Sequence, residues 1–311
     1  MIKRSHPWLV ASMGVTLALG GAAVGRAQQQ NSQQSSSSQS QAAPPSSNQA
    51  APAPSLERRP ATAPAPPAVN AEETQAYKAI QEELNPDKQL QLVEDFEKKY
   101  PNSPLLSDAY FFGASASEQK NNVAGALSYG QKSLKLRPDN LRSLILVASL
   151  LPLPQALQGT EQQKEQQLIQ SESDANRALQ LLTQLQKEPN LSADQFQKAK
   201  EQITAQLHAA LGMAHLETAT LAPGPPNTSE LASAEQEYKA AVAGPEPAAQ
   251  DYYRLGEVYA RENKLDDSIA AFTKASQLGQ GTLVQKYADG MAQRLKEQKA
   301  KSQPAPAPTA Q

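Results

Sequence analysis

Two histidines, His208 and His215, are the first residues to consider as metal ligands or general bases, because the only other histidine, His6, lies just before an apolar N-terminal run. They are seven residues apart in a stretch that favours helix, which separates them by about 10.5 Å along the helix axis. Both imidazoles cannot bind one metal ion across that distance. We therefore predict no metal site and interpret both histidines as partly buried packing residues.

Three pairs of adjacent carboxylates have the residue types of a general acid and a general base: Glu72-Glu73, Glu82-Glu83 and Asp266-Asp267. Successive residues on a helix point about 100° apart, so the two side chains of a pair do not converge on one substrate. We interpret all three pairs as solvated helix faces.

The other residue types that perform covalent chemistry lack the sequence context for it. Ser229 and Ser268 stand outside a nucleophile-elbow motif, and Gly279-Gln280-Gly281 has no preceding strand, unlike a phosphate-binding loop. The chain has no cysteine, which excludes disulfides, iron–sulfur clusters and thiolate metal sites. We predict that the protein is not an enzyme and binds no cofactor.

The N-terminus has the pattern of a bacterial secretory signal peptide. Lys3 and Arg4 precede an apolar run over residues 8–25, and Gly25-Arg26-Ala27 is a suitable cleavage site. We predict a signal peptide at 1–27 and an exported protein, periplasmic or secreted. Because the apolar run approaches the ~20 residues that span a bilayer, an uncleaved inner-membrane anchor at residues 8–25 remains the alternative.

Two flanking segments have compositions that do not support a folded core. Residues 28–69 are almost entirely Gln, Ser, Ala and Pro, and the tail 301–311 is of the same kind. Such segments have too little apolar surface to offset the entropy lost on ordering. We predict a disordered linker at 28–69 and a disordered tail at 301–311.

Between these segments, residues 70–300 favour helix throughout. Alanine, Leu, Gln, Lys and Glu dominate, and the prolines fall where turns are expected. Since no stretch alternates with period two, we predict no strands and an all-α domain.

One segment of this domain carries a specific repeat signature. Residues 249–282 contain Tyr252-x-x-Leu255-Gly256-x-x-Tyr259, followed by Phe272-x-x-Ala275. This pattern resembles the tetratricopeptide (TPR) repeat, a helical hairpin of 34 residues. The resemblance implies a right-handed superhelix of stacked antiparallel helix pairs, since one hairpin cannot bury its apolar stripe alone. The motif at 100–110 is also similar to those of exported bacterial TPR proteins of the cell envelope.

Counting from Glu73 in steps of 34 places the starts of the second and third units at 107 and 141, and the third and fourth units are longer. The units are expected at about 73–106, 107–140, 141–190, 192–248 and 249–282, with a cap helix at 283–299. In the second unit, Ala114 and Ala126 are the small residues expected where two helices cross. The third unit is interrupted by Pro152 and Pro154, and its second helix is expected to resume around Ala175. The cap helix is expected to turn Val284, Tyr287 and Met291 inward.

The resemblance also implies a groove lined by the first helix of each unit. Carried over to this chain, the candidate partner-binding residues are Tyr77, Phe111, Ser115, Glu118, Gln250, Tyr253, Glu257 and Arg261. The aromatic members have an alternative role, packing against the neighbouring helix. Only Arg254 matches the basic set that chaperone-binding TPR domains use to hold a terminal carboxylate, which argues against that function.

These patterns favour a non-catalytic scaffold of the bacterial cell envelope that binds a partner peptide or protein in its concave groove. The alternative is an anchored structural or self-associating component of an envelope complex that does not use the groove. A formal net charge of −2 argues against nucleic acid as the partner. Membrane contact is expected only through an uncleaved N-terminal segment.

Overall fold

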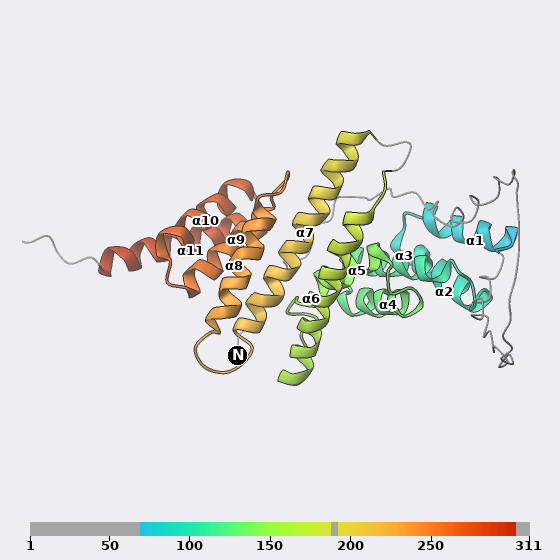
Figure 1. Cartoon of the computed structure of the whole chain (residues 1–311), viewed down its shortest axis with the longest axis horizontal. Coiled ribbons are helices and arrows are strands. Elements are labelled where there is room, and N and C mark those ends of the chain that lie inside the picture. Colours follow the sequence, from blue (N-terminus) through green and yellow to red (C-terminus); the bar gives the residue numbers. More distant parts are fainter. Residues whose placement is uncertain (1–68, 188–191, 303–311) are drawn as a thin grey trace, which may run out of the picture. The chain divides into compact units, whose positions relative to one another are not determined.

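The computed structural model describes residues 69–187 and 192–302 (Figure 1). All of them belong to one compact unit. The predicted signal peptide at 1–27, the linker at 28–69 apart from its last residue, and the tail beyond Ser302 lie outside the described residues.

The described residues contain eleven α-helices and no strand, which confirms the prediction of an all-α fold. In chain order the helices are α1 (Ala71–Glu82), α2 (Pro86–Lys99), α3 (Leu106–Gln119), α4 (Val123–Leu136), α5 (Leu141–Leu150), α6 (Glu161–Gln184), α7 (Ala193–Ala219), α8 (Thr228–Val242), α9 (Ala249–Arg261), α10 (Leu265–Leu278) and α11 (Leu283–Ser302). Each helix packs against the next one in the chain, so the domain is a TPR-like stack of helical hairpins.

Two of the hairpins turn in the same way at equivalent positions. Asn121 joins α3 to α4 and Asn263 joins α9 to α10, and these two residues have φ angles of 56° and 60°. Asparagine is one of the few side-chain-bearing residues that adopts this left-handed conformation readily. The two asparagines are 142 residues apart but occupy the same place in their hairpins, which supports a common repeat geometry.

Glycines allow the two helices of a hairpin to approach closely. A Cβ atom built at Gly256 of α9 would lie 2.9 Å from the Phe272 ring of α10, and one at Gly212 of α7 would lie 2.9 Å from the Tyr238 ring of α8. Both aromatic side chains are almost fully buried. A larger residue at either glycine would push the helices apart, which explains the Leu-Gly pairs seen in the sequence.

Helix α6 begins earlier than expected. The sequence suggested that this helix resumes around Ala175, whereas the structure starts it at Glu161. Thr160 and Gln163 form a reciprocal capping box, in which the Thr160 hydroxyl accepts from the Gln163 backbone and the Gln163 side chain accepts from the Thr160 backbone. This cap and the good helix propensity of glutamine extend the helix across the Gln-rich stretch.

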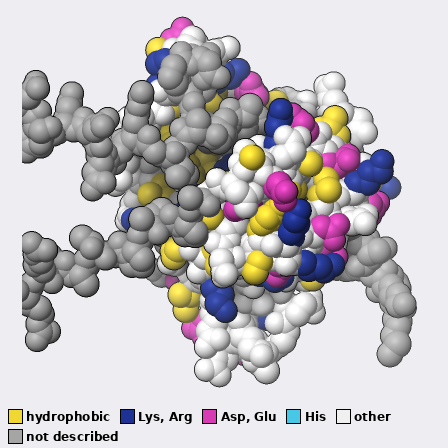
Figure 2. All heavy atoms as spheres, turned by 90° about the vertical axis from the view of Figure 1, so that its right-hand side faces the viewer, with side chains coloured by type: hydrophobic (Ala, Val, Ile, Leu, Met, Phe, Trp, Pro, Cys, Tyr) yellow, Lys and Arg dark blue, Asp and Glu magenta, His cyan; other side chains and the backbone are white. Residues whose placement is uncertain are grey.

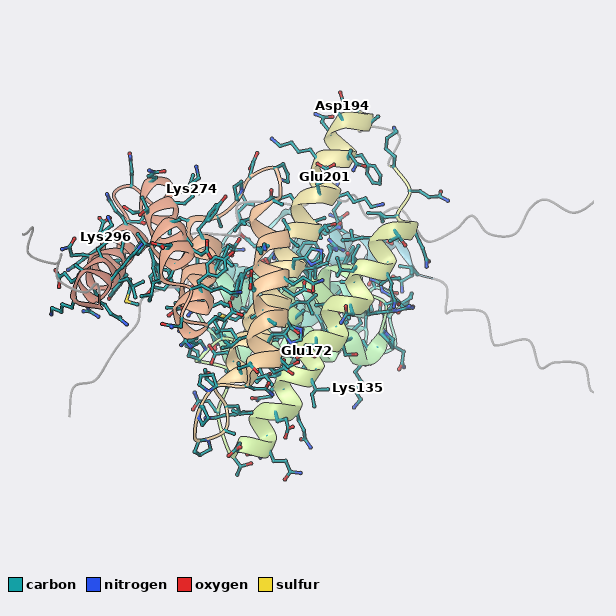
Figure 3. All side chains as sticks on the ribbon, turned by 60° about the vertical axis from the view of Figure 1, so that its left-hand side comes forward. Lys135, Glu172, Asp194, Glu201, Lys274 and Lys296 are labelled. Carbon is teal, nitrogen blue, oxygen red and sulfur yellow. The ribbon has the colours of Figure 1, made fainter. Side chains whose placement is uncertain are left out.

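Helices α6 and α7 are longer than the others, with 24 and 27 residues. A second capping box between Ser192 and Gln195 starts α7. The first turns of α7 extend past the neighbouring helices, and Asp194 lies at the projecting tip in Figure 3. The hairpins in the middle of the stack are therefore elongated compared with the hairpins at its two ends.

A buried network of hydroxyl and amide groups joins α3, α4 and α5. Asn140, the N-cap of α5, donates to the hydroxyls of Ser107 and Ser133 at 3.1 and 3.2 Å, and Ser143 donates to Ser133 at 2.7 Å. All four residues are buried. Their hydrogen bonds satisfy polar groups that would otherwise destabilise the core of the second and third hairpins.

The last helix, α11, covers the end of the stack, and two of the three residues predicted to face inward do so. Its buried residues are Ala288, Ala292 and Leu295, which form an i, i+4, i+7 stripe. Val284 and Met291 are partly buried against the same cluster. Tyr287 is 42% exposed, so its predicted inward position is wrong: it lies one residue, about 100° around the helix, before Ala288.

Candidate functional site

The helices form two layers that differ in spacing. The backbone of each odd-numbered helix from α1 to α9 closely approaches that of the next odd-numbered helix. Among the described helices, the backbones of successive even-numbered helices are farther apart, although the Lys132–Glu97 ion pair joins the side chains of α4 and α2. We call the surface formed by α1, α3, α5, α7 and α9 the A face. It is the more closely spaced layer, and all eight candidate partner-binding residues belong to its helices.

At the N-terminal end of the A face, aromatic side chains form a cluster. Tyr77 of α1 is only 9% exposed, and its ring centroid lies 6.2 Å from those of Phe96 and Phe112. Phe111 of α3 is partly buried and lies 5.6 Å from Phe112. Tyr77 therefore serves mainly in packing between α1, α2 and α3, whereas Phe111 keeps part of its surface accessible.

A charged group covers the ring of Phe111. The Arg142 guanidinium of α5 lies 4.6 Å from that ring centroid, and it also donates to Asp108 at 3.2 Å. Arg137 pairs with the same carboxylate. This arrangement combines a cation–π contact with an ion pair and holds the Phe111 ring in place.

Ser115 and Glu118 follow Phe111 on the same side of α3, at i+4 and i+7, and both are partly buried. Burial raises the pKa of the Glu118 carboxyl above its usual value. These two residues extend the surface around Phe111 along α3, so the structure brings these three predicted residues together.

The other four predicted residues lie together on α9. Tyr253 packs edge-on against Phe272, with ring centroids 5.1 Å apart, and remains partly exposed. Glu257 accepts a charged hydrogen bond from Arg254 at 2.7 Å, and Arg261 is exposed and donates to the Glu257 backbone oxygen at 3.2 Å. Gln250 is partly buried at the start of the helix. Because α3 and α9 do not contact each other, the candidate residues form two separate groups.

A cavity that the sequence did not indicate lies on the A face between these groups. It has a volume of about 160 Å³ and is lined by residues of α5, α7, α8 and α9, including Gln250 of α9. Arg254 and Asp251 also line it. Burial raises the pKa of Asp251 to about 6, and a backbone hydrogen bond at Ala248 partly offsets that effect. No sequence motif predicts this cavity because its walls come from helices far apart in the chain.

Both histidines are partly buried, as expected, but each also contacts a carboxylate. His208 Nδ1 lies 2.6 Å from Glu237 of α8, with 27% of the histidine side chain exposed. His215 Nδ1 lies 2.8 Å from Glu230 and 3.7 Å from Glu172, which Figure 3 labels on α6. These contacts connect α7 to its two neighbours. The sequence alone does not predict these histidine–carboxylate contacts, because it does not show which residues of α7 and α8 lie opposite each other.

The carboxylate pairs are not all solvated. Asp266 and Asp267 are exposed, but Glu73 is only 6% exposed, which contradicts its interpretation as part of a solvated face. Glu73 lies one turn before Tyr77 and so falls on the inward stripe of α1, while its neighbour Glu72 points outward. Successive residues on a helix point about 100° apart, so the two carboxylates do not converge, and Glu73 is buried while Glu72 is exposed.

The described residues include no group of three or more His, Asp or Glu side chains arranged to hold a metal ion. Within the same ranges, every helix is too short or too polar to cross a membrane. Acidic and basic side chains are interspersed over the described part of the face shown in Figure 2.

The comparisons with known proteins give likenesses of structure only. No family model and no curated protein matches this chain. Among solved structures, TTC0263, described as a thermophilic TPR protein in Thermus thermophilus, is 17% identical with a TM-score of 0.46, and the match covers 70% of this chain and 98% of that chain. A crystal structure of MamA protein is 18% identical with a TM-score of 0.31, covering 66% and 100% of the two chains. The P58(IPK) TPR domain is 14% identical with a TM-score of 0.26, covering 74% and 65%.

Proposed function

We propose that this protein is a non-catalytic scaffold of the bacterial cell envelope that binds a partner peptide or protein along its A face. The observation that carries the proposal is the spacing of the two helix layers. In a curved stack of hairpins, the layer whose successive helices lie closer together is on the inner side, and here that layer is the A face. Solenoid proteins commonly bind their ligands on this inner surface.

The chemistry of the A face supports a protein ligand. Phe111 and Tyr253 are aromatic, partly exposed and held by neighbouring groups, as residues that dominate binding energy in protein interfaces often are. Glu118, Glu257 and Arg261 provide charges around them. An extended or helical peptide with apolar side-chain anchors fits such a surface, and binding would work by positioning the partner.

The predicted signal peptide at 1–27 is what supports the proposed location in the envelope. The apolar run at 8–25, the preceding Lys3 and Arg4 and the small residues before Gln28 support export. The Gln-, Ser-, Ala- and Pro-rich residues 28–69 would then connect the helical domain to the processed end of the chain or to an N-terminal anchor.

Substitution of the two A-face aromatics tests the proposal. The exported protein is used to capture partners from an envelope fraction, with and without the combined change Phe111→Ala and Tyr253→Asp. Capture of the wild-type partners should fall at least tenfold. The control is Leu136→Asp, which adds a charge at an exposed residue of α4, outside the A face, and should leave capture unchanged.

The folded state of the variants is checked by circular dichroism, because Tyr253 packs on Phe272. If the double variant is folded and captures the same partners as the wild type, the A face is not the binding surface. That result would favour the alternative of a structural or self-associating component that leaves the groove unused.

A further inference from the structure

Two arginines share a single carboxylate at the N-terminal end of the A face. Arg142, in the first turn of α5, donates from Nη2 to Asp108 Oδ1 at 3.2 Å, and Arg137, the C-cap of α4, donates from Nη2 to the same oxygen. Asn140 donates to this oxygen as well, at 3.2 Å. Because both guanidinium groups lie within ion-pair distance of one atom, the two groups are held close together.

The charges of this cluster do not balance. Arginine stays protonated in proteins, so the two guanidinium groups carry two positive charges against the one negative charge of Asp108. In the described ranges neither Arg137 nor Arg142 forms an ion pair with a second carboxylate. The nearby Tyr77 phenol supplies no negative charge, because burial raises its pKa above the usual value. The cluster therefore has one surplus positive charge.

The three charged side chains are partly shielded and still accessible to solvent. The side chains of Arg137, Arg142 and Asp108 are 41%, 17% and 15% exposed. A charge with partial shielding interacts more strongly with an incoming charge than a fully solvated one does. An anion can therefore reach the two arginines and should bind them more tightly than it binds a fully exposed arginine.

An aromatic side chain lies directly beside the surplus charge. The Arg142 guanidinium carbon is 4.6 Å from the ring centroid of Phe111, which is partly exposed. Asp108 and Phe111 are three residues apart on α3 and so lie on the same side of that helix. A ligand that contacts the two arginines is therefore within reach of an apolar surface.

Charge and shape restrict the class of ligand. An ammonium group would be repelled, and a carboxamide would leave the surplus charge unbalanced. A carboxylate matches the planar guanidinium with charge-assisted hydrogen bonds, and its single charge balances the cluster. A phosphate monoester carries about −1.5 to −2 at neutral pH, more than the surplus.

We propose that Arg137 and Arg142 bind the side-chain carboxylate of a glutamate or aspartate in an extended partner peptide, with an apolar side chain of that peptide on Phe111. In an extended chain, side chains two residues apart point to the same side, about 6.6 Å from each other, which suits a guanidinium and a ring that lie side by side. The inference rests on the proposed function, because it names the chemistry of one part of the partner held on the A face.

The test uses the full exported chain and fluorescein-labelled peptides capped at the C-terminus, Ala-Leu-Ala-Glu-Ala and its Gln, Lys and phosphoserine counterparts. Binding is followed by fluorescence anisotropy. The Glu peptide should bind at least tenfold more tightly than the Gln and Lys peptides, and its advantage should shrink as salt screens the charges. Equal affinities of the Glu and Gln peptides would overturn the proposal. Much tighter binding of the phosphoserine peptide would overturn it too, in favour of a phosphate site.

A pair of matched variants assigns the binding to this cluster. Arg137→Gln removes one positive charge at a position that is 41% exposed and should lower the affinity for the Glu peptide at least fivefold. Arg177→Gln is the control, because Arg177 of α6 is similarly exposed and pairs with Asp139 outside the A face. Wild-type affinity in a folded Arg137→Gln variant would contradict the proposal.

Asp108→Asn separates a binding role of the arginines from a purely structural one. The substitution removes the negative charge that competes with the ligand, and the amide oxygen that replaces it still accepts hydrogen bonds. The affinity for the Glu peptide should therefore rise at least threefold. If the arginines only hold α3, α4 and α5 together, loss of the ion pairs should leave peptide binding unchanged or weaker, and that result would count against the proposal.

The two proposals fail in different ways. If envelope partners are lost with Phe111→Ala and Tyr253→Asp but retained with Arg137→Gln, and no peptide prefers Glu, the carboxylate site fails and the A-face function stands. If the Glu peptide binds as described while the A-face variants capture every partner, the carboxylate site stands and the scaffold function fails.

Discussion

Individual residues in this protein act through close packing between helices and through buried polar groups. Gly256 and Gly212 let α9 and α7 approach the aromatic rings of α10 and α8. Asn140 caps α5 and joins a hydroxyl network. Asp251 and Arg254 place charge in a cavity of the A face. In each case the effect depends on a few ångströms of separation between helices, so single substitutions should have clear consequences.

Replacement of Gly256 by alanine should destabilise the fold by about 1–3 kcal/mol, because the new Cβ would lie 2.9 Å from the Phe272 ring. Urea unfolding followed by circular dichroism measures the change. Gly290→Ala is the matched control: that glycine is helical and a Cβ there meets open space, so the substitution should stabilise by about 0.5–1 kcal/mol. Equal effects of the two substitutions would refute the packing argument.

Asp251 should make stability depend on pH. Burial raises its pKa from 3.8 to about 6 in the folded protein. The folded state therefore binds this proton more tightly than the unfolded state, and the stability associated with it is present below pH 4 and lost as pH rises to about 6. Asp251→Asn removes that loss, so it should raise the unfolding free energy by about 1–3 kcal/mol at pH 7.5 and by little at pH 4.

Urea unfolding of wild type and variant at the two pH values checks this prediction. Asp267→Asn, at an exposed position, serves as the control. A gain for Asp251→Asn that is the same at both pH values would show that the titration of this carboxyl is not the cause.

At the scale of elements, two long helices distinguish the middle of the stack from its ends. Both α6 and α7 begin with capping boxes, at Thr160 and Ser192, and both start in polar sequence with little burial. Local hydrogen bonding therefore determines where these helices begin, while packing begins only two turns later, at Leu168 in α6. Helix α7 contacts α5, α6, α8 and α9 and provides one wall of the cavity.

Removing the cap of α6 should shorten the helix without unfolding the domain. Thr160→Ala is expected to cost about 1 kcal/mol and to raise amide hydrogen exchange over residues 161–167. Thr160→Ser keeps the hydroxyl and should behave as the wild type. Unchanged exchange in Thr160→Ala would mean that tertiary contacts, and not the capping box, hold the start of α6.

At the scale of the whole molecule, tryptophan fluorescence tests whether the predicted signal peptide is removed during export. The only tryptophan of the chain is Trp8, inside the predicted signal peptide. Protein purified from the envelope fraction should therefore show no tryptophan emission and should begin at Gln28. Clear tryptophan emission from a homogeneous preparation would instead indicate that residues 8–25 are retained as an anchor.

Much of the architecture followed from local patterns. The Leu-Gly pairs, the helix-favouring composition and the prolines at turns were sufficient to predict helical hairpins, because helix formation and helix crossing depend on nearby residues. The errors concern which side chains of a helix are buried, which depends on their position around the helix axis. Glu73 is buried and Tyr287 is exposed, each opposite to its prediction, because periodicity alone does not determine which side of a helix its neighbours cover.

The sequence by itself determined the class of the fold, an all-α repeat domain without cysteine, and it predicted export from the pattern of the N-terminus. Only the tertiary structure decided which side chains meet. It separated the predicted residues into a group around Phe111 and a group around Tyr253, and it brought Gln202 and Arg254 into the lining of one cavity. Residues on helices about 50 positions apart have no common local pattern, and their contacts depend on how the helices pack against one another.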